Sequence, residues 1–489
     1  MFGGIRRMFP RKIFSDSEPP SSHHSFLLGR KLANPLEDDE LVRKNRETAA
    51  YSALNVTFHR INNLRCMQIR QLCRNILVAD PSERQGSEHH FGLFDNTSWT
   101  WTAIFSHPIS HMPYPNVFHL PGEDISHSTD IKPAAISQPL INSIPPDLLP
   151  RFDPVFAKYH AHYSAGRLAA HQIPIEDYRA NPCKYNIVYG RATAPDVHSI
   201  TDVQCPVSPA GDGKSSITVK IYEPAPDINE GKPRPAYINF HGGGWVLGGL
   251  ESDMEFCKRL VGELKCVVFD VDYRLAPEYQ YPIPVNDCIE AFKWIQSDDM
   301  VRKRNLDRQK FAVGGISAGG MLAAVISHVC REEGMPLSFQ MLGVPVVDMD
   351  GYGPDGKLTE KGWERYRSYR EMEFTVSLPM AKMEYFARHF FGEKRDHTTY
   401  NNWKVSPILA TNFKGLAPAL IMTAEMDPLR DEGEAYGEKM NAAGSKAEVI
   451  RMKGMPHTFM MMDDILENGM RYNREAIRAL AAAWGVAKK

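Results

Sequence analysis

Short apolar segments alternate with longer amphipathic ones from residue 216 onward, and this alternation is the clearest pattern in the chain. Apolar runs of strand length bounded by turn residues predict buried strands, and runs with a 3.6-residue period predict helices. Seven strands are predicted, at 216–222, 236–240, 266–271, 311–314, 339–344, 419–423 and 447–452, with helices near 250–264, 284–298, 318–332 and 430–443. Apolar strands separated by helices predict an α/β fold, in which a mainly parallel sheet is flanked by helices on both faces.

The first 138 residues do not share this pattern. One amphipathic helix is predicted near 41–78, and its apolar face carries Leu54, Phe58, Ile61, Ile69, Leu72 and Ile76. The segment 107–146 is rich in Pro, His and Ser without a sustained period, so it is predicted to be a loop or linker. We therefore divide the chain into a poorly patterned N-terminal extension, 1–138, and an α/β domain, 139–489. Early in that domain, Leu148–His171 is predicted to be helical and 184–190 to be a short strand.

The charge balance argues against several kinds of partner. The chain has 57 basic and 59 acidic residues, so no net field favours nucleic acid or an anionic membrane. No window approaches the roughly 18 consecutive apolar residues that a membrane span requires. Near the N-terminus basic residues are mixed with apolar ones, but Pro10 and Asp16 interrupt a presequence-like helix. We expect a cytoplasmic protein, with mitochondrial import as the alternative.

The cysteines do not form a disulfide or zinc pattern. Several lie in apolar runs, which indicates buried reduced thiols, and no pair has C-x-x-C spacing. No structural metal is expected. The eight are Cys66, Cys73, Cys183, Cys205, Cys257, Cys266, Cys288 and Cys330.

A serine between glycines lies where a predicted strand meets a predicted helix. The pattern G-x-S-x-G spans Gly315–Gly319, after the apolar run that begins at Phe311 and before the helix-forming run that follows. The five residues alone fit an ordinary turn better, because glycine and serine are common. The strand before them and the helix after them favour a nucleophile elbow, in which Ser317 presents its hydroxyl at the edge of the sheet.

Three consecutive glycines follow the predicted strand 236–240, in the run His241-Gly242-Gly243-Gly244-Trp245. Glycines can expose backbone N–H groups toward a cavity, which is what a negatively charged oxygen in acyl transfer requires. A flexible turn is the alternative interpretation. We favour an oxyanion hole because the run comes directly after a buried strand, and we interpret His241 as a structural residue that orients the loop.

A serine nucleophile needs a base, and that base needs a carboxylate. Downstream of Ser317, Asp427 follows the predicted strand 419–423 and His457 follows the predicted strand 447–452. Both positions fit the order Ser, acid, His. Glu425, Asp431 and Glu432 are nearby competitors for the acid, and we favour Asp427 over them. The remaining histidines, such as His328 and His389, are expected to be packing or surface residues.

These motifs together resemble the hormone-sensitive-lipase-like branch of the α/β-hydrolase family. The resemblance covers roughly 139–489 and includes Asp272–Glu278 as a further motif. It implies an α/β-hydrolase fold with a helical cap built from about 139–190 and 351–403. It also implies a triad of Ser317, Asp427 and His457, with an oxyanion hole formed by the backbone N–H groups of Gly242, Gly243 and Ala318. The chain departs from the common pattern at Ile316 and Thr458, which affects expectations about substrate preference and pH range.

The expected activity is that of a serine hydrolase that cleaves small or medium carboxylic esters or lactones through an acyl-enzyme, without a metal or organic cofactor. One alternative is an acyltransferase or tailoring hydrolase in natural-product metabolism. Another is a non-catalytic small-molecule receptor on the same fold, which the presence of all three triad residues disfavours. Arg274 and Glu278 are expected to pair within a scaffolding turn. The aromatic and Met-rich insert is expected to form the core of the cap and part of an apolar pocket.

Overall fold

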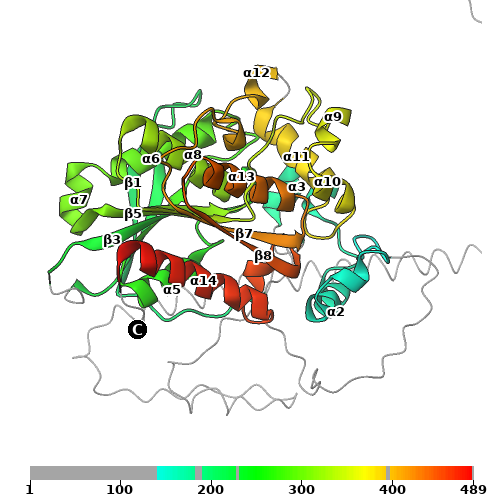
Figure 1. The fold of residues 1–489 in the computed structure, drawn as a ribbon, viewed down its shortest axis with the longest axis horizontal. Coiled ribbons are helices and arrows are strands. Elements are labelled where there is room, and N and C mark those ends of the chain that lie inside the picture. The colour runs from blue at the N-terminus through cyan, green and yellow to red at the C-terminus, as the bar shows by residue number, and fades with distance from the viewer. Residues whose placement is uncertain (1–139, 182–184, 186–189, 227–230, 393–396, 487–489) are drawn as a thin grey trace, which may run out of the picture. The chain divides into compact units, whose positions relative to one another are not determined.

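The computed structural model describes residues 140–489, apart from 182–184, 186–189, 227–230, 393–396 and 487–489 (Figure 1). The helix predicted near 41–78 lies outside the described residues. Of the short strand predicted at 184–190, Tyr185 and Gly190 are described, and neither lies in a strand.

Eight strands form one sheet, in the order β1-β2-β4-β3-β5-β6-β7-β8. β1 is antiparallel to β2 and β2 is antiparallel to β4, whereas every other neighbouring pair is parallel. The predicted α/β fold with a mainly parallel sheet is therefore confirmed. The strands are β1 (Ser199–Pro206), β2 (Ser216–Glu223), β3 (Arg234–Phe240), β4 (Val267–Asp272), β5 (Leu306–Ile316), β6 (Phe339–Gly343), β7 (Ala419–Met426) and β8 (Ala447–Pro456).

All seven predicted strands are present, but β1 was not predicted. β1 lies at the edge of the sheet and pairs with β2 alone among the described strands. Of its side chains only Cys205 is fully buried, so the strand lacks the apolar run that marks the buried strands. β5 begins at Leu306, earlier than predicted. The prediction missed its first half because those residues are mostly polar and partly exposed, so they form no apolar run.

Helices cover both faces of the sheet (Figure 1). One face carries α5 (Met254–Leu264) and α14 (Glu467–Trp484), which share an apolar core with Tyr237 and Val268 of the strands. The other face carries α6 (Ile283–Ile295), α8 (Ala318–Glu333) and α13 (Arg430–Ala442), in a second core with Ile238 and Phe269. α7 (Asp298–Arg304) leads into β5. The alternation of strand side chains between two cores explains the continuous apolar runs in the sequence.

In their described residues, the two segments expected to form a cap contain short helices, turns and one isolated β-bridge, between Tyr352 and Leu358. The first contains η4 (Leu149–Arg151), α2 (Pro154–Tyr163), η5 (Ala170–Gln172) and α3 (Ile175–Ala180). The second contains α9 (Glu360–Trp363), α10 (Arg367–Glu371), α11 (Met380–Phe391) and α12 (His397–Tyr400), followed by η7 (Pro407–Leu409); a further turn, η8 (Phe459–Met462), follows β8. The single helix predicted over Leu148–His171 is wrong, because the chain leaves the helix at Phe152, where φ is −73° and ψ is 149°, and restarts at Pro154.

The strand register brings the ends of distant segments together. Phe240 pairs with Gly315, so the loop after β3 begins beside the turn after β5. Met426 pairs with Pro456, so Asp427 and His457 are the next residues on adjacent strands. Because the carboxyl ends of parallel strands meet at one edge of the sheet, all the candidate catalytic residues gather there.

Candidate active site

Ser317 occupies a strained turn between β5 and α8. Its φ is 60° and its ψ is −117°, a combination that L-residues rarely adopt. The glycines on either side make the turn possible: a Cβ at Gly315 would lie 2.2 Å from the carbonyl oxygen of Phe240, and one at Gly319 would lie 1.8 Å from it. The structure therefore has the strand-turn-helix geometry expected of a nucleophile elbow.

The backbone of Ser317 is hydrogen-bonded to the last residue of β6 and to the segment that follows β6. Its N–H donates to the Gly343 carbonyl at 2.8 Å, and its carbonyl accepts from Val346 at 3.3 Å. The residue is 8% exposed, so its side chain is largely withdrawn from bulk water. A candidate nucleophile in such a fixed and partly dry position would need little reorganisation to react.

The glycine loop after β3 approaches this turn closely. A Cβ at Gly242 would lie 2.9 Å from the Ile316 carbonyl oxygen, and one at Gly243 would lie 2.1 Å from the Leu247 carbonyl oxygen. Gly243 also has a φ of +119°, which side-chain-bearing residues avoid. Within the described residues, the backbone N–H groups of Gly242, Gly243 and Ala318 donate no hydrogen bond. Such free donors are what an oxyanion hole offers to a substrate.

His241, the first residue of this loop, packs inside the protein, where it contacts the loop backbone. It is fully buried, its Nδ1 lies 2.8 Å from the Gly242 carbonyl oxygen, and its ring stacks on Tyr273 at 4.3 Å. The Tyr273 hydroxyl in turn donates to the His241 carbonyl at 2.8 Å. Burial lowers the pKa of His241, so the ring is held neutral and can donate from Nδ1 to the loop. These contacts agree with the structural role inferred from the sequence.

The candidate base and acid are in direct contact. His457 Nδ1 lies 2.7 Å from Asp427 Oδ2, and both residues are buried. The other carboxylate oxygen of Asp427 accepts the backbone N–H of Leu429 at 3.0 Å. No hydrogen bond joins Ser317 Oγ to His457 among the described residues; in enzymes without bound substrate, hydrogen bonds between catalytic groups are often long and shorten only in the substrate complex. The arrangement leaves His457 Nε2 as the nitrogen available to exchange a proton.

The competing carboxylates have other partners. Glu425 accepts from the Gly454 N–H at 2.9 Å, and Asp431 accepts from the Ser368 N–H at 2.8 Å and from Arg430 Nε at 2.7 Å. Glu432 is fully buried, accepts from the Val347 N–H at 2.7 Å, and has its pKa raised well above the usual range by burial. Among the described residues, none of the three hydrogen-bonds to His457.

The expected pair of Arg274 and Glu278 in the turn at Asp272–Glu278 is wrong. Arg274 does not pair with Glu278; it forms a buried double contact with Asp287, at 2.5 and 2.8 Å. Glu278 pairs instead with Arg179 of α3 at 2.6 Å. Arg179 also donates to the Val246 carbonyl at 2.7 Å, which ties α3 to the glycine loop. Sequence reasoning did not single out Arg179, because its partners are 67 to 99 residues away and no local pattern marks it.

Aromatic side chains of α11 cover the glycine loop. A Cβ at Gly244 would lie 2.3 Å from the ring of Phe386, and the ring of Trp245 stacks on Phe390 at 4.2 Å. Phe386 is 7% exposed and Phe390 is fully buried. The insert between β6 and β7 therefore contributes apolar surface directly beside the candidate oxyanion hole.

The other expectations for side chains concern histidines, thiols and metals. His328 is buried among Trp403, Phe413 and Tyr436, and His389 packs edge-on against Tyr385. The five described cysteines are buried and free. Over the described ranges, no group of three or more His, Cys, Asp or Glu side chains is placed to hold a metal ion. In the same part of the chain, no helix combines the length and hydropathy that crossing a bilayer requires.

Known proteins resemble the chain over this same region. Residues 237–461 match the family model described as alpha/beta hydrolase fold. An AB hydrolase superfamily protein of Schizosaccharomyces pombe is 34% identical over 342 residues, which is 68% of this chain and 94% of that protein. An arylesterase of Saccharolobus solfataricus is 31% identical over 291 residues, covering 58% of this chain and 88% of the relative.

A solved structure gives the same result. EstE1, a thermophilic carboxylesterase cloned from a metagenomic library, aligns with a TM-score of 0.52 and 36% identity over 60% of this chain and 91% of that one. The fold, the order of the motifs and these similarities together show that the chain belongs to the carboxylesterase-type, hormone-sensitive-lipase-like branch of the α/β-hydrolase family.

Proposed function

We propose that this protein hydrolyses small or medium carboxylic esters or lactones through an acyl-enzyme formed on Ser317, with His457 as base and Asp427 as acid. The observation that carries the proposal is the 2.7 Å contact between His457 Nδ1 and the fully buried carboxylate of Asp427. Ser317, on its strained turn at the same edge of the sheet, supplies the nucleophile. Esterases among the relatives and structural neighbours support the substrate class.

In acylation, the proton of the Ser317 hydroxyl passes through His457 to the leaving alcohol, and a bond from Ser317 Oγ to the acyl carbon replaces the ester bond. Ser317 Oγ attacks the carbonyl carbon of the ester while its proton passes to His457 Nε2, and the carbonyl oxygen becomes an oxyanion. The free N–H groups of Gly242, Gly243 and Ala318 are the donors that would stabilise this oxyanion. His457 then gives the proton to the leaving alcohol as the carbon–oxygen bond breaks, which leaves the acyl group on Ser317.

Deacylation repeats these steps with water. A water molecule attacks the acyl carbon and gives a proton to His457 Nε2, and the imidazolium returns that proton to Ser317 Oγ as the carboxylic acid leaves. Asp427 stabilises the imidazolium in both halves, because its carboxylate lies on Nδ1. All the proton transfers use side chains of this chain, so the mechanism that we propose needs no metal or organic cofactor.

We place the cap in the two segments 139–190 and 351–403. α11 contributes Phe386 and Phe390 beside the glycine loop, and α3 reaches the same loop through Arg179. An apolar roof of this kind suits the acyl or alcohol portion of a small ester and excludes water from the oxyanion.

The proposal is tested by comparing the wild-type protein with Ser317→Ala on p-nitrophenyl esters graded in acyl length. Removing one oxygen from the elbow should lower kcat by about 10³-fold or more, because only binding and oxyanion effects remain. Retention of more than about a tenth of the wild-type turnover would overturn the assignment of the nucleophile. Product analysis with an added alcohol decides the acceptor: the free acid alone supports hydrolysis, whereas a new ester as main product would make the protein an acyltransferase.

A further inference from the structure

The position of the Asp427 carboxylate depends on the backbone around it. Asp427 follows β7 directly and precedes α13, in a loop of three residues. One carboxylate oxygen contacts His457 at 2.7 Å, and the other accepts the Leu429 N–H at 3.0 Å. Neither of these contacts fixes the loop to another part of the fold apart from the histidine itself. The contacts that hold the backbone of the residues on either side of Asp427 therefore matter for the position of its carboxylate.

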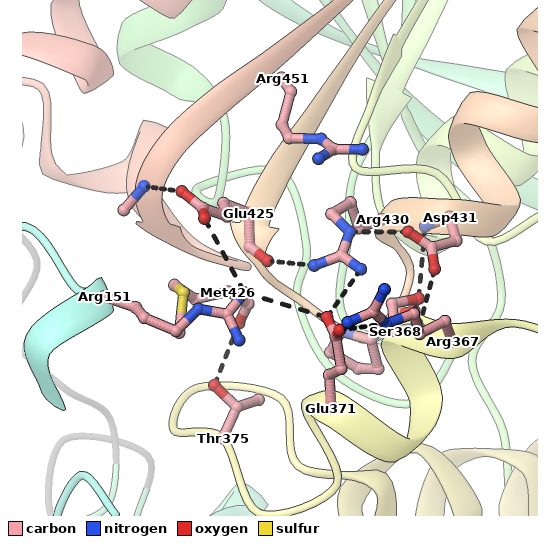
Figure 2. A network of polar contacts seen from close by, with 12 residues as sticks. Arg151, Arg367, Ser368, Glu371, Thr375, Glu425, Met426, Arg430, Asp431 and Arg451 are labelled. Atoms are coloured by element: carbon pink, nitrogen blue, oxygen red, sulfur yellow. Dashed lines mark hydrogen bonds and ion pairs between the residues drawn. The ribbon is translucent and has the colours of Figure 1, made fainter. Parts of the chain in front are cut away.

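Two hydroxyl groups from the 351–403 insert hold the backbone of Met426 and Pro428, the residues on either side of Asp427 (Figure 2). Thr375 Oγ1 donates to the Met426 carbonyl at 3.0 Å, and Ser368 Oγ donates to the Pro428 carbonyl at 2.5 Å. Both donors are buried, with exposed fractions of 2% for Thr375 and 0% for Ser368. The carbonyls of the residue before Asp427 and of the residue after it thus each accept a hydrogen bond from the insert.

Ser368 is itself fixed to the start of α13. Its backbone N–H donates to Asp431 Oδ2 at 2.8 Å, and its hydroxyl accepts the Asp431 N–H at 3.3 Å. Although burial acts in the opposite direction, the hydrogen bond from Arg430 holds the pKa of Asp431 below its usual range, so the carboxylate remains charged. α10 and the first turn of α13 therefore form one polar unit.

Arg430 extends this unit to the strand that carries the acid (Figure 2). Its guanidinium donates to the Glu425 carbonyl at 3.0 Å through Nη1 and pairs with Glu371 Oε2 at 3.0 Å through Nη2. Glu371 lies three residues after Ser368, on the same turn of α10. The insert thus contacts three backbone carbonyls at the end of β7 and in the loop after it: those of Met426 and Pro428 directly, and that of Glu425 through Arg430.

We propose that Ser368 and Thr375 are positioning residues that orient the acid Asp427, so that the 351–403 insert controls the triad as well as covering the pocket. The proposal rests on the proposed function, because it needs Asp427 to act on His457. If either hydroxyl is lost, a buried carbonyl beside Asp427 loses its donor, and the loop can relax away from His457. The imidazolium is then stabilised less, which slows the chemical steps and leaves substrate binding largely unchanged.

The test uses substitutions that remove one hydroxyl at nearly constant volume. Thr375→Val and Ser368→Ala should each lower kcat about 10-fold with KM within about twofold, since small displacements of a catalytic group cost this much or more. The acidic limb of the rate profile should move to lower pH, because a base with a poorly placed carboxylate is protonated less readily. Thr375→Ser keeps the hydroxyl and should restore turnover to within about twofold of wild type.

Thr359→Ala provides the matched control within the same insert. The Thr359 hydroxyl donates to the Gly351 carbonyl at 2.9 Å and caps α9, so its loss removes a hydrogen bond of the same kind away from the acid loop. We expect a lower melting temperature with unchanged kcat and an unchanged acidic limb. If Thr375→Val and Ser368→Ala behave like Thr359→Ala, both hydroxyls are only structural and the proposal is wrong.

A double-mutant cycle separates this proposal from the proposed function. In an Asp427→Asn background, Thr375→Val should reduce kcat by less than about twofold, since a residue that acts through the acid has nothing left to orient. Fully additive losses would contradict the positioning role while leaving Asp427 as the acid. If Asp427→Asn alone had little effect on kcat, the triad assignment itself would fail, which is a different result.

Discussion

The acid of the triad is tested by Asp427→Asn, because this change keeps the size of the side chain and removes its charge. The carboxylate oxygen lies 2.7 Å from His457 Nδ1 in a fully buried position. At an effective dielectric constant of about 20, the attraction of unit charges at this distance is at most about 6 kcal/mol, or about 10⁴-fold in rate. An amide also favours the wrong imidazole tautomer. We expect kcat to fall by about 10³- to 10⁴-fold with little change in KM.

The controls are two neighbouring carboxylates, Asp431 and Glu425, which the sequence analysis considered as alternatives to Asp427 for the acid of the triad. Asp431→Asn keeps an oxygen that can accept the Ser368 N–H, and Glu425→Gln keeps one that can accept the Gly454 N–H. The ion pair between Glu425 and Arg151, at 3.8 Å and partly exposed, is worth little. Both variants should lose less than about 10-fold in kcat. The assay is steady-state hydrolysis of p-nitrophenyl acetate, and a larger loss for Asp431→Asn than for Asp427→Asn would refute the assignment.

Three further predictions address the elbow, the pH dependence of stability and the extension. Gly319→Ala places a Cβ where 1.8 Å separates it from the Phe240 carbonyl oxygen, so it should destabilise the fold by about 1–3 kcal/mol or more and abolish labelling by a fluorophosphonate. Its control, Gly262→Ala in α5, meets no atom within 4 Å and should raise the melting temperature. Burial lowers the pKa of His328 to about 3, so the unfolded state binds the proton first and stability falls as the pH drops below about 6.5. At pH 5 this loss amounts to about 2 kcal/mol, which His328→Phe should remove in urea unfolding compared at pH 7 and 5. A protein that starts near Gln138 should fold, label with the probe and hydrolyse short esters within about threefold of the full-length rate; an insoluble or unlabelled product would contradict the division of the chain at this point.

The parts of the fold with local signals in the sequence were predicted well. β3, β4, β5 and β7 are buried strands whose apolar runs stand out, and the glycine motifs mark the turns where backbone geometry excludes larger side chains. β1 was missed because an exposed edge strand has no such run. α14 was missed although Tyr472, Ala476 and Leu480 recur at helical spacing on its buried face, a signal that the sequence does contain.

The contacts between distant segments could not be read from the sequence. Arg274 and Glu278 lie four residues apart and suggest a pair, yet their partners are Asp287 and Arg179. The hydroxyls of Ser368 and Thr375 lie about 50 to 60 residues before the carbonyls to which they donate, in an insert without regular periodicity. Such contacts depend on how the insert packs against the sheet, and residue type and spacing do not encode that packing locally.

The central claim is that an acyl group is transferred to Ser317 during turnover. Its most direct test is mass spectrometry of the protein after rapid acid quench during hydrolysis of a p-nitrophenyl ester, with peptide mapping of the adduct. We predict one acyl group per chain, located on Ser317, and none on the Ser317→Ala protein. Ester hydrolysis by the wild-type protein without any adduct, or an adduct on a different residue, would contradict the account.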